Sequence, residues 1–530
     1  MYNVRRILIS AATFALCAGA AAPVLAAPPV EFDSHVEAVR KDAGTPGVAI
    51  AIVENGEVTL AKGYGTRKIG TNDKVDADTI FMIGSTGKAF TTAALATLVD
   101  AGKIGWDDPV INHIPWFQMY DSWVTREMTV RDLLVHRSGL PLGAGDLLYV
   151  PRGDISREEL VRRLRFIKPD TSFRSQYAYD NILYAVAGQL IQEVSGQSWE
   201  DYMHDHVFAA AGFKSAAATD AVHFGNSNRA FPHGRVGGTV RGLSDQKLLD
   251  ERDQLGRAAA PAGMIAMSAN DMARWLQIQL AHGATPEGGR LFSEQAGLEM
   301  WKPVTPMPIA PPRKGLEDMT PSYQAYALGW QVQDYHGTQI VWHAGGLFGF
   351  TSIVVLIPEK NVGFAIEVNA EDIQPRYGLM YELLDHYLDR PHQDWPEKFG
   401  TYLDERLAAA AAVVNTAREE PVAIGPSLEV GRYAGTYVDP WYGKLVVTAK
   451  ARDLSVNFTT TPGMTGRLKH WQYDTFVTQF DDKSIEPAYL TFAIGAAGEV
   501  TGITARAVSP IADFSFDYHH LNFVPADKKE

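Results

Sequence analysis

The chain is best understood from residues 78–102, which read DTIFMIGSTGKAFTTAALATLVDAG. The apolar run that ends at Ile83 predicts a strand, and the apolar spacing from Phe90 to Val99 predicts a helix that ends at Gly102. Ser85 and Lys88 lie where the strand gives way to the helix. Because positions i and i+3 share one face of a helix, the lysine amine can reach the serine hydroxyl.

The pairing of Ser85 with Lys88 predicts covalent catalysis. A serine hydroxyl is a poor nucleophile until a neighbouring base takes its proton, and N–H groups in a first helical turn can stabilise an oxyanion. The spacing alone is weak evidence, because Ser244 and Lys247 share it and Ser85 could be an ordinary helix cap. A phosphate-binding loop is excluded, because Ala89 stands where that motif needs Ser or Thr.

Two further motifs contribute polar groups. Residues 179–181 read YDN before a predicted helix over 182–194. A phenol such as that of Tyr179, placed near a lysine, can be held with a lowered pKa and shuttle protons. The adjacent amide of Asn181 can hold a substrate carbonyl. Residues 342–346 read WHAGG at the end of a predicted strand, where Gly345 and Gly346 let a substrate backbone approach the strand edge. Tyr179 as a core aromatic and His343 as a strand histidine are the alternatives, and residues 223–225 (HFG) share the His-x-Gly pattern in a loop-like stretch.

Together the three motifs, in this order and at this wide spacing, resemble the serine β-lactamase and penicillin-binding-protein superfamily. The likeness is greater to its class C-like, CubicO branch, which includes D-aminopeptidases, carboxypeptidases and esterases. Three flanking phrases extend the resemblance over about residues 31–390: TVRDLLVHRSGL at 129–140, PAGM at 261–264 and LGW at 328–330.

The resemblance implies a role for each residue of these motifs. Ser85 is expected to be the acylated nucleophile, Lys88 and Tyr179 its general-base pair, and Asn181 the group that holds the substrate amide. The N–H groups of Ser85 and Gly346 are expected to form the oxyanion hole. His343 stands where many relatives have lysine. Since histidine is mostly neutral at pH 7, this favours esters or aminopeptidase-type substrates over β-lactams and peptides that end in a free carboxylate.

Strand patterns predict an α/β fold with a second, all-β domain. A hairpin over 47–65, with its turn at Asn55-Gly56, and short β-branched runs at 340–342, 351–357 and 362–368 lie at the two ends of residues 30–390. They predict an antiparallel sheet flanked by helices, closed by a helix at 379–388, with an inserted helical lobe. We expect a hydrolase domain over 27–395, a helical and polar linker over 396–427 with a helix at 403–414, and a lipocalin-like β-barrel over 428–530.

The start of the chain predicts export. Residues 1–26 combine Arg5 and Arg6 with a short apolar run and small residues before Ala26, which is typical of a cleaved signal peptide. Cys17, the one cysteine of the 530 residues, lies inside this leader, so the mature chain is expected to have no disulfide. A net charge of −14 argues against nucleic acid and anionic membranes as partners, and no other stretch suggests an integral membrane segment.

These features predict a periplasmic or secreted serine hydrolase that cleaves an amide or ester bond of a small molecule or peptide, without a cofactor. No metal site is expected: His204 and His206 lack a third ligand, and His519 and His520 are neighbours on opposite faces of a predicted strand. A β-lactamase or D-Ala-D-Ala carboxypeptidase is the alternative within the same class. A sensor that binds such compounds without turnover is the alternative from another class. The oligomeric state stays open.

Overall fold

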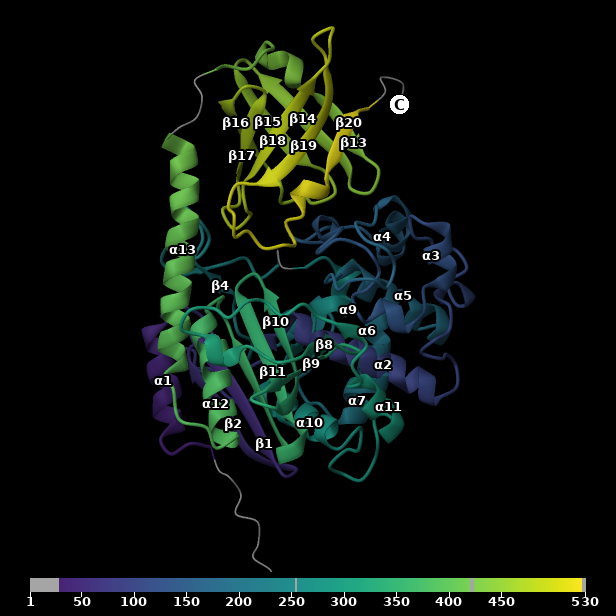
Figure 1. Ribbon diagram of the computed structural model, residues 1–530, viewed down its shortest axis with the longest axis vertical. Coiled ribbons are helices and arrows are strands. Elements are labelled where there is room, and N and C mark those ends of the chain that lie inside the picture. Colours follow the sequence, from purple (N-terminus) through teal and green to yellow (C-terminus); the bar gives the residue numbers. More distant parts are fainter. Residues whose placement is uncertain (1–27, 253–254, 420–423, 527–530) are drawn as a thin grey trace, which may run out of the picture.

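The computed structural model describes residues 28–252, 255–419 and 424–526. The predicted signal peptide therefore lies outside the described residues. An α/β domain forms the lower part of the molecule and a closed β-barrel stands above it (Figure 1). This confirms the predicted fold class. Within the described ranges, no helix combines the length and apolar character that a membrane crossing requires.

The α/β domain is built on an eight-stranded antiparallel sheet of order β2-β1-β12-β11-β10-β9-β8-β7. Both ends of the domain sequence contribute, since β1 pairs with β12 from Val48–Val368 to Glu54–Val362. The strands are β1 (Gly47–Glu54), β2 (Glu57–Gly65), β7 (Thr305–Pro306), β8 (Gln324–Tyr326), β9 (Gln331–Tyr335), β10 (Thr338–Leu347), β11 (Phe350–Ile357) and β12 (Val362–Val368).

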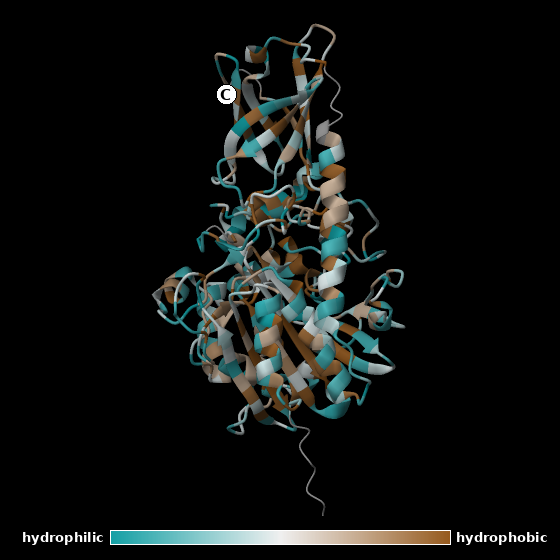
Figure 2. Cartoon of the chain, turned by 90° about the vertical axis from the view of Figure 1, so that its left-hand side faces the viewer, coloured by the Kyte–Doolittle hydropathy of each residue, from teal (hydrophilic) through white to brown (hydrophobic). Residues whose placement is uncertain are grey.

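Both faces of this sheet are covered by helices, as the period-two pattern of β1 shows. Val48, Ile50 and Ile52 pack with α1 and α12, whereas Ala49 and Ala51 belong to the larger core that includes α2 and α10. In Figure 2 the sheet strands are predominantly hydrophobic, as a sheet buried on both faces requires. The helices here are α1 (Phe32–Asp42), α2 (Lys88–Asp100), α10 (Ala269–Leu280) and α12 (Leu379–Tyr387).

The predicted helical lobe lies between β2 and β7. A two-residue pairing of β3 (Phe81–Met82) with β6 (Ala266–Met267) fixes the segment that enters α2. The remaining lobe elements are α3 (Ser122–Glu127), α4 (Arg157–Arg163), α5 (Ile182–Ser195), α6 (Trp199–Tyr202), α7 (Ala209–Ala211), α8 (Asp220–Gly225), α9 (Ala260–Gly263), α11 (Glu294–Met300), and the short strands β4 (His233–Gly234) and β5 (Lys247–Leu248). Residues 223–225, expected in a loop, end α8.

A single long helix connects the two domains. α13 (Trp395–Glu419) has 25 residues, so the helix expected at 403–414 begins and ends well beyond those bounds. It runs along one side of the sheet domain toward the barrel (Figure 1). Leu407, Ala410 and Val414 form a buried cluster that Val508 and Ile511 of the barrel domain contact. The linker is therefore largely a packed helix.

The barrel closes from eight antiparallel strands in sequence order. Its interior is filled by aromatic side chains such as Tyr433, Tyr442, Phe458 and Phe492. The strands are β13 (Gly435–Asp439), β14 (Gly443–Lys450), β15 (Asp453–Phe458), β16 (Thr465–Gln472), β17 (Thr475–Phe480), β18 (Ala488–Ile494), β19 (Val500–Ala507) and β20 (Asn522–Pro525). His519 and His520 lie in a 3-10 turn (Tyr518–His520) before β20, so the strand expected there is wrong.

The connection between the last two strands, residues 508–521, docks the barrel onto the helical lobe; we refer to it as the β19–β20 loop. Phe516 stacks on Phe348 with ring centroids 5.5 Å apart. Ser515 Oγ donates to Asp146 Oδ2 at 2.8 Å, and the N–H of Gly145 donates to Asp517 Oδ2 at 2.7 Å. The barrel is therefore joined to the α/β domain by buried polar and apolar contacts.

Candidate active site

Ser85 lies in a 3-10 turn (Gly84–Gly87) between β3 and α2, as the sequence predicted. Gly84 has a φ of 53°, in the left-handed region, and a Cβ on it would lie 2.7 Å from the Gly346 nitrogen. Glycine therefore fits here for two reasons, backbone conformation and close approach to β10. The turn presses the serine against the strand that carries the WHAGG motif.

Lys88 is the first residue of α2, and its side chain is buried beneath Ser85. Its Nζ atom lies 2.9 Å from Ser85 Oγ and donates to Asn181 Oδ1 at 2.7 Å and to the Ala262 carbonyl at 2.9 Å. Burial lowers the pKa of Lys88 to about 7, against an opposing effect of Asp146. A neutral amine has two hydrogens and one lone pair. With both hydrogens directed at carbonyl oxygens, the lone pair faces Ser85.

Tyr179 also contacts the serine. Its phenol hydrogen-bonds Ser85, and Lys88 Nζ lies 4.8 Å from the centre of its ring. Burial raises the pKa of Tyr179 well above its ordinary value, although the bond to Ser85 acts in the opposite direction. The lowered pKa expected from a neighbouring lysine is therefore wrong, because desolvation of the phenolate outweighs that neighbour. Tyr179 is a neutral phenol at pH 7.

Asn181 stands between Lys88 and a carboxylate that the sequence analysis did not identify. Asn181 Oδ1 accepts from Lys88, and Nδ2 donates to Asp146 Oδ2 at 2.9 Å. Asp146 is fully buried, and burial raises its pKa to about 7. It follows two glycines in a stretch with no recognisable motif, so no sequence signal marked it.

The WHAGG strand has a free edge beside Ser85. β10 pairs with β11 as far as Leu347, whereas its pairing with β9 stops at Trp342. A Cβ on Gly345 would lie 2.0 Å from the Ile83 carbonyl oxygen, so only glycine fits there, while Gly346 faces open space. The backbone of residues 343–347 can therefore pair with an extended substrate, as expected from the sequence.

The His343 ring is buried between Tyr326 and the predicted catalytic residues, with its centroid 6.3 Å from that of Tyr179. Its side chain is buried, with Nδ1 donating to the Ala344 carbonyl at 2.7 Å and Nε2 lying 2.8 Å from the Tyr326 hydroxyl. Burial, reinforced by Lys88, lowers the pKa of His343 to about 3. Of the seven predicted site residues, Ser85, Asn181 and Gly346 line the pocket, whereas the His343 ring lies behind them, 6.3 Å from the ring of Tyr179.

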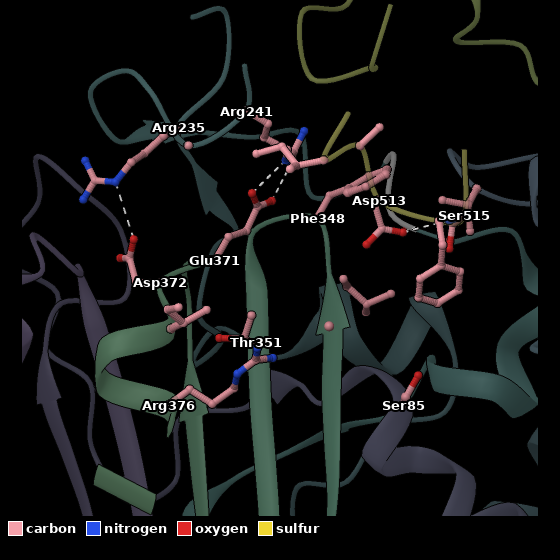
Figure 3. Close-up of a pocket in the computed structure, with 18 of the residues that line it drawn as sticks. Ser85, Arg235, Arg241, Phe348, Thr351, Glu371, Asp372, Arg376, Asp513 and Ser515 are labelled. Atoms are coloured by element: carbon pink, nitrogen blue, oxygen red, sulfur yellow. Dashed lines mark hydrogen bonds and ion pairs between the residues drawn. The ribbon is translucent and has the colours of Figure 1, made fainter. Parts of the chain in front are cut away.

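The pocket above Ser85 has a volume of about 490 Å³ and is lined by both domains (Figure 3). Ser85, Asn181 and Gly346 contribute from the α/β domain, and the β19–β20 loop contributes residues 511–515. Phe514 packs on the ring of Tyr179 with centroids 5.9 Å apart. The charged residues of the lining are Arg235, Arg241, Glu371, Asp372, Arg376, Arg406 and Asp513.

Two of the four arginines in the pocket are in ion pairs. Arg241 pairs with Glu371, and Arg235 lies 3.5 Å from Asp372. Arg376 has no carboxylate partner among the described residues; its Nη1 donates to the Gly345 carbonyl at 3.1 Å, and its buried Nε has no acceptor there. In the view of Figure 3, the ends of β10 and β11 lie between Ser85 and Arg376.

The second Ser-x-x-Lys match has a different environment. Lys247 Nζ donates to the Val236 carbonyl at 2.8 Å, and Ser244 Oγ donates to the same carbonyl at 3.1 Å, so the two side chains do not bond each other. His204 and His206 lie in a π-helical segment (Met203–Phe208) and contact Asp205 and Gln197. Within the described ranges, no group of three or more His, Cys, Asp or Glu is arranged to hold a metal ion.

Comparison with known proteins agrees with this architecture. Residues 32–388 match the family described as beta-lactamase, and residues 419–525 match a domain of unknown function, DUF3471. The fold and these matches define a serine hydrolase. Because the first match covers more than half of the chain, the protein belongs to the β-lactamase family.

Curated relatives are similar over most of this length. An unguisins hydrolase, ungD, of Aspergillus violaceofuscus is 28% identical over 509 residues, covering 91% of this chain and 86% of the relative. A second one, from Aspergillus campestris, is 30% identical, covering 76% of this chain and 74% of the relative. Penicillin-binding protein 4 of Amycolatopsis lactamdurans is 29% identical over 64% of this chain and 84% of its own length.

Solved structures are similar over most of the chain. The octameric penicillin-binding protein homologue from Pyrococcus abyssi superposes with a TM-score of 0.58 at 19% identity, covering 90% of this chain and 98% of that one. SurE superposes with a TM-score of 0.53 at 20% identity, covering 93% and 98%. At this level of identity, these two structures support the fold.

Proposed function

We propose that the protein is an exported serine hydrolase that cleaves an amide or ester bond through an acyl-enzyme on Ser85. The observation that carries this proposal is the contact of 2.9 Å between Lys88 Nζ and Ser85 Oγ, in a buried site where the pKa of Lys88 is lowered to about 7. A lysine that is partly neutral at physiological pH can act as a general base. Two unguisins hydrolases among the relatives support a hydrolytic function.

Acylation begins when the neutral Lys88 amine accepts the proton of Ser85 while Oγ attacks the substrate carbonyl carbon. The carbonyl π electrons move to oxygen, and the N–H groups of Ser85 and Gly346 stabilise the oxyanion. Collapse of the intermediate expels the amine or alcohol. The leaving group receives its proton from Lys88 through the phenol of Tyr179, which passes on one proton as it accepts another.

Deacylation repeats these steps with water in place of Ser85. Water attacks the acyl carbonyl, Tyr179 and Lys88 relay its proton to Ser85 Oγ, and the acid product leaves. Asn181 holds Lys88 with its Oδ1, which leaves one of its two amide hydrogens free for the substrate carbonyl, because the other is donated to Asp146. The chain's own residues thus account for every proton.

The proposal also covers the substrate and the location of the protein. An extended acyl compound or peptide fits the free edge of β10, and a neutral His343 favours substrates that need no cation from that position. D-amino-acid peptides and esters are the proposed substrate class. The leader over residues 1–26 supports a periplasmic or secreted location.

The test is covalent labelling and turnover. A fluorophosphonate probe should label Ser85 in the full-length protein, as read by mass spectrometry. Ser85→Ala should abolish labelling and lower kcat roughly 10³- to 10⁶-fold on a panel of p-nitrophenyl esters, nitrocefin and D- and L-aminoacyl anilides. Ser244→Ala is the matched control and should behave like the wild type. Unchanged turnover in Ser85→Ala, or labelling of Ser244, contradicts the proposal.

A further inference from the structure

A continuous hydrogen-bond chain connects the barrel with the nucleophile. Ser515 Oγ donates to Asp146 Oδ2 at 2.8 Å, and Asn181 Nδ2 donates to the same oxygen at 2.9 Å. Asn181 Oδ1 accepts from Lys88 Nζ at 2.7 Å, and Lys88 lies 2.9 Å from Ser85 Oγ. Asp146 and Lys88 are fully buried, and Ser515 is nearly so. Asp146 and Lys88 are therefore shielded from water, while Asn181 and Ser85 face the pocket.

The carboxylate decides which way the Asn181 amide points. In its ionised form Asp146 only accepts hydrogen bonds, so it requires the NH₂ end of the amide and turns the carbonyl end toward Lys88. The opposite orientation would place Oδ1 against the Asp146 oxygens and NH₂ against the lysine amine. Because the carbonyl of Asn181 occupies one N–H of Lys88, its orientation helps to aim the lysine lone pair at Ser85.

The barrel holds Asp146 by its backbone as well as by its side chain. The N–H groups of Gly145 and Leu147, on either side of Asp146, donate to Asp517 at 2.7 and 3.2 Å. Thr461 Oγ1, also in the barrel, donates to the Leu147 carbonyl at 2.7 Å. Three barrel side chains are thus bonded to residues 145–147 of the helical lobe. Such contacts are buried and fully partnered, which makes them costly to lose.

We propose that Asp146 is a positioning residue for the Lys88–Ser85 pair, and that the barrel, through Ser515 and Asp517, holds Asp146 in the orientation that activates the site. The inference rests on the proposed hydrolysis at Ser85. It gives the C-terminal domain a part in acylation. All predicted catalytic residues lie in the first domain, and on that ground alone the barrel would be dispensable for small substrates.

The electrostatics agree with this assignment. Asp146 is the group that raises the pKa of Lys88 against the effect of burial. Burial and then Asp517 raise the pKa of Asp146, while bonds from Tyr149, Asn181 and Ser515 lower it. The other titratable groups around the pair are His136, Tyr149, Tyr179, Asp180, Tyr184 and His343. Burial favours the neutral form of each, so the charge balance at the site depends on Lys88, Asp146 and Asp517.

The proposal predicts how the rate of Ser85 labelling depends on pH. Lys88 must be neutral to act, so labelling of Ser85 should rise with pH around the pKa of Lys88. Removing the negative charge of Asp146 should lower that pKa and move the midpoint to lower pH. Loss of the Ser515 bond makes Asp146 easier to protonate and should move the midpoint in the same direction by less. A purely structural defect would lower the rate equally at every pH.

The experiment measures the rate of fluorophosphonate labelling of Ser85 from pH 5 to 9 in the full-length protein. Asp146→Asn should slow labelling roughly 10- to 100-fold at pH 7 and shift the midpoint to lower pH. Ser515→Ala should slow it roughly threefold to tenfold, while Ser515→Thr, which keeps the hydroxyl, should restore the wild-type rate. Ser455→Ala, an exposed serine of β15, is the matched control and should change neither quantity.

The outcomes separate this inference from the proposed function. If the wild-type protein is not labelled at Ser85, the proposed function fails. If the wild type is labelled but Asp146→Asn and Ser515→Ala show the wild-type rate and midpoint, the positioning role is wrong while the hydrolase assignment stands. If Asp146→Asn does not fold, the comparison of Ser515→Ala with Ser515→Thr decides whether the positioning role holds. Both variants change only a barrel residue: the first removes the hydroxyl that bonds Asp146, and the second keeps it.

Discussion

The Nε2 atom of His343 lies 2.8 Å from the hydroxyl of Tyr326, buried behind the residues that line the pocket. With Nδ1 donating to the Ala344 carbonyl, the ring accepts the Tyr326 hydrogen as a neutral imidazole. His343, expected at the position of a substrate-anchoring lysine, therefore supports the strand that is proposed to pair with the substrate.

This arrangement predicts a pH-independent preference. Since the pKa of His343 is lowered to about 3, the ring stays neutral from pH 5.5 to 9. The kcat/KM ratio for a carboxylate substrate and its methyl ester should show no titration near pH 6.5, because the titration of Lys88 affects both equally. His343→Gln should lower both values together, by roughly tenfold, through loss of the buried bond to Tyr326. A ratio that rises below pH 6.5 in the wild type and not in His343→Gln would place the ring in the binding site.

A second prediction concerns Arg376. Like Arg406, it lines the Ser85 pocket without a carboxylate partner among the described residues, and its contact with the Gly345 carbonyl places it at β10, where it can receive an anionic part of the substrate. In a competition assay against fluorophosphonate labelling, aliphatic carboxylates of suitable length should bind roughly tenfold tighter than their amides. Arg376→Gln should remove this difference and Arg376→Lys should keep part of it. Arg406→Gln is the control and should keep the preference for carboxylates over amides. If that variant loses the preference and Arg376→Gln keeps it, Arg406 of α13 is the residue that binds the carboxylate.

A third prediction concerns Phe514, which forms part of the pocket wall from the barrel side. Its ring packs on Tyr179, and a Cβ on Gly143 would lie 2.7 Å from the phenyl ring. Phe514→Ala should raise KM for small apolar acyl esters roughly threefold to tenfold, because apolar surface is lost from the pocket. Phe514→Leu should retain most of the affinity. A kcat that falls while KM is unchanged would show that the ring acts on Tyr179 rather than on the substrate.

A fourth prediction concerns stability. Glu367 of β12 is buried, and neither carboxylate oxygen has a hydrogen-bond partner among the described residues. Burial raises its pKa well above the ordinary value, with a further effect of Asp271. The folded protein therefore holds a proton here that the unfolded chain releases, so this residue's contribution to stability falls as pH rises above about 4.5.

Replacing Glu367 by glutamine should remove its contribution to the pH dependence of the free energy of unfolding. The stability of Glu367→Gln relative to the wild type should increase by up to about 1.4 kcal/mol for each pH unit above 5. Urea unfolding at pH 5 and pH 8 measures the difference, with Glu359→Gln, an exposed glutamate, as control. A difference between the two proteins that stays constant with pH would mean that Glu367 is ionised in the folded state.

Local pattern was enough to predict much of this fold. The hairpin turn at Asn55-Gly56, the strand–turn–helix around Ser85 and the helices α2 and α5 are set by residues close together in sequence. The contact between Ser85 and Lys88 could be predicted for the same reason. The meeting of Tyr179, Asn181 and Gly346 with that pair was expected from the resemblance to the family, since spacing alone does not bring such distant segments together.

What the sequence could not reveal depends on burial and on long-range docking. The direction of the Tyr179 pKa follows from desolvation, which no local pattern reports. Asp146 has neither a motif nor a charged neighbour in sequence, and its partner Ser515 lies 369 residues further along the chain. The inward orientation of His343 depends on Tyr326 from another strand. These features need the folded chain.

The β19–β20 loop also affects when the enzyme becomes competent. A chain is synthesised from its N-terminus, so Ser85, Lys88 and Asp146 emerge long before Ser515, which follows Asp146 by 369 residues. During that interval the nucleophile has neither the wall that residues 511–515 form nor the bonds that hold residues 145–147. Under the positioning role proposed for Asp146, the serine therefore gains its full reactivity only when the barrel has closed over the pocket.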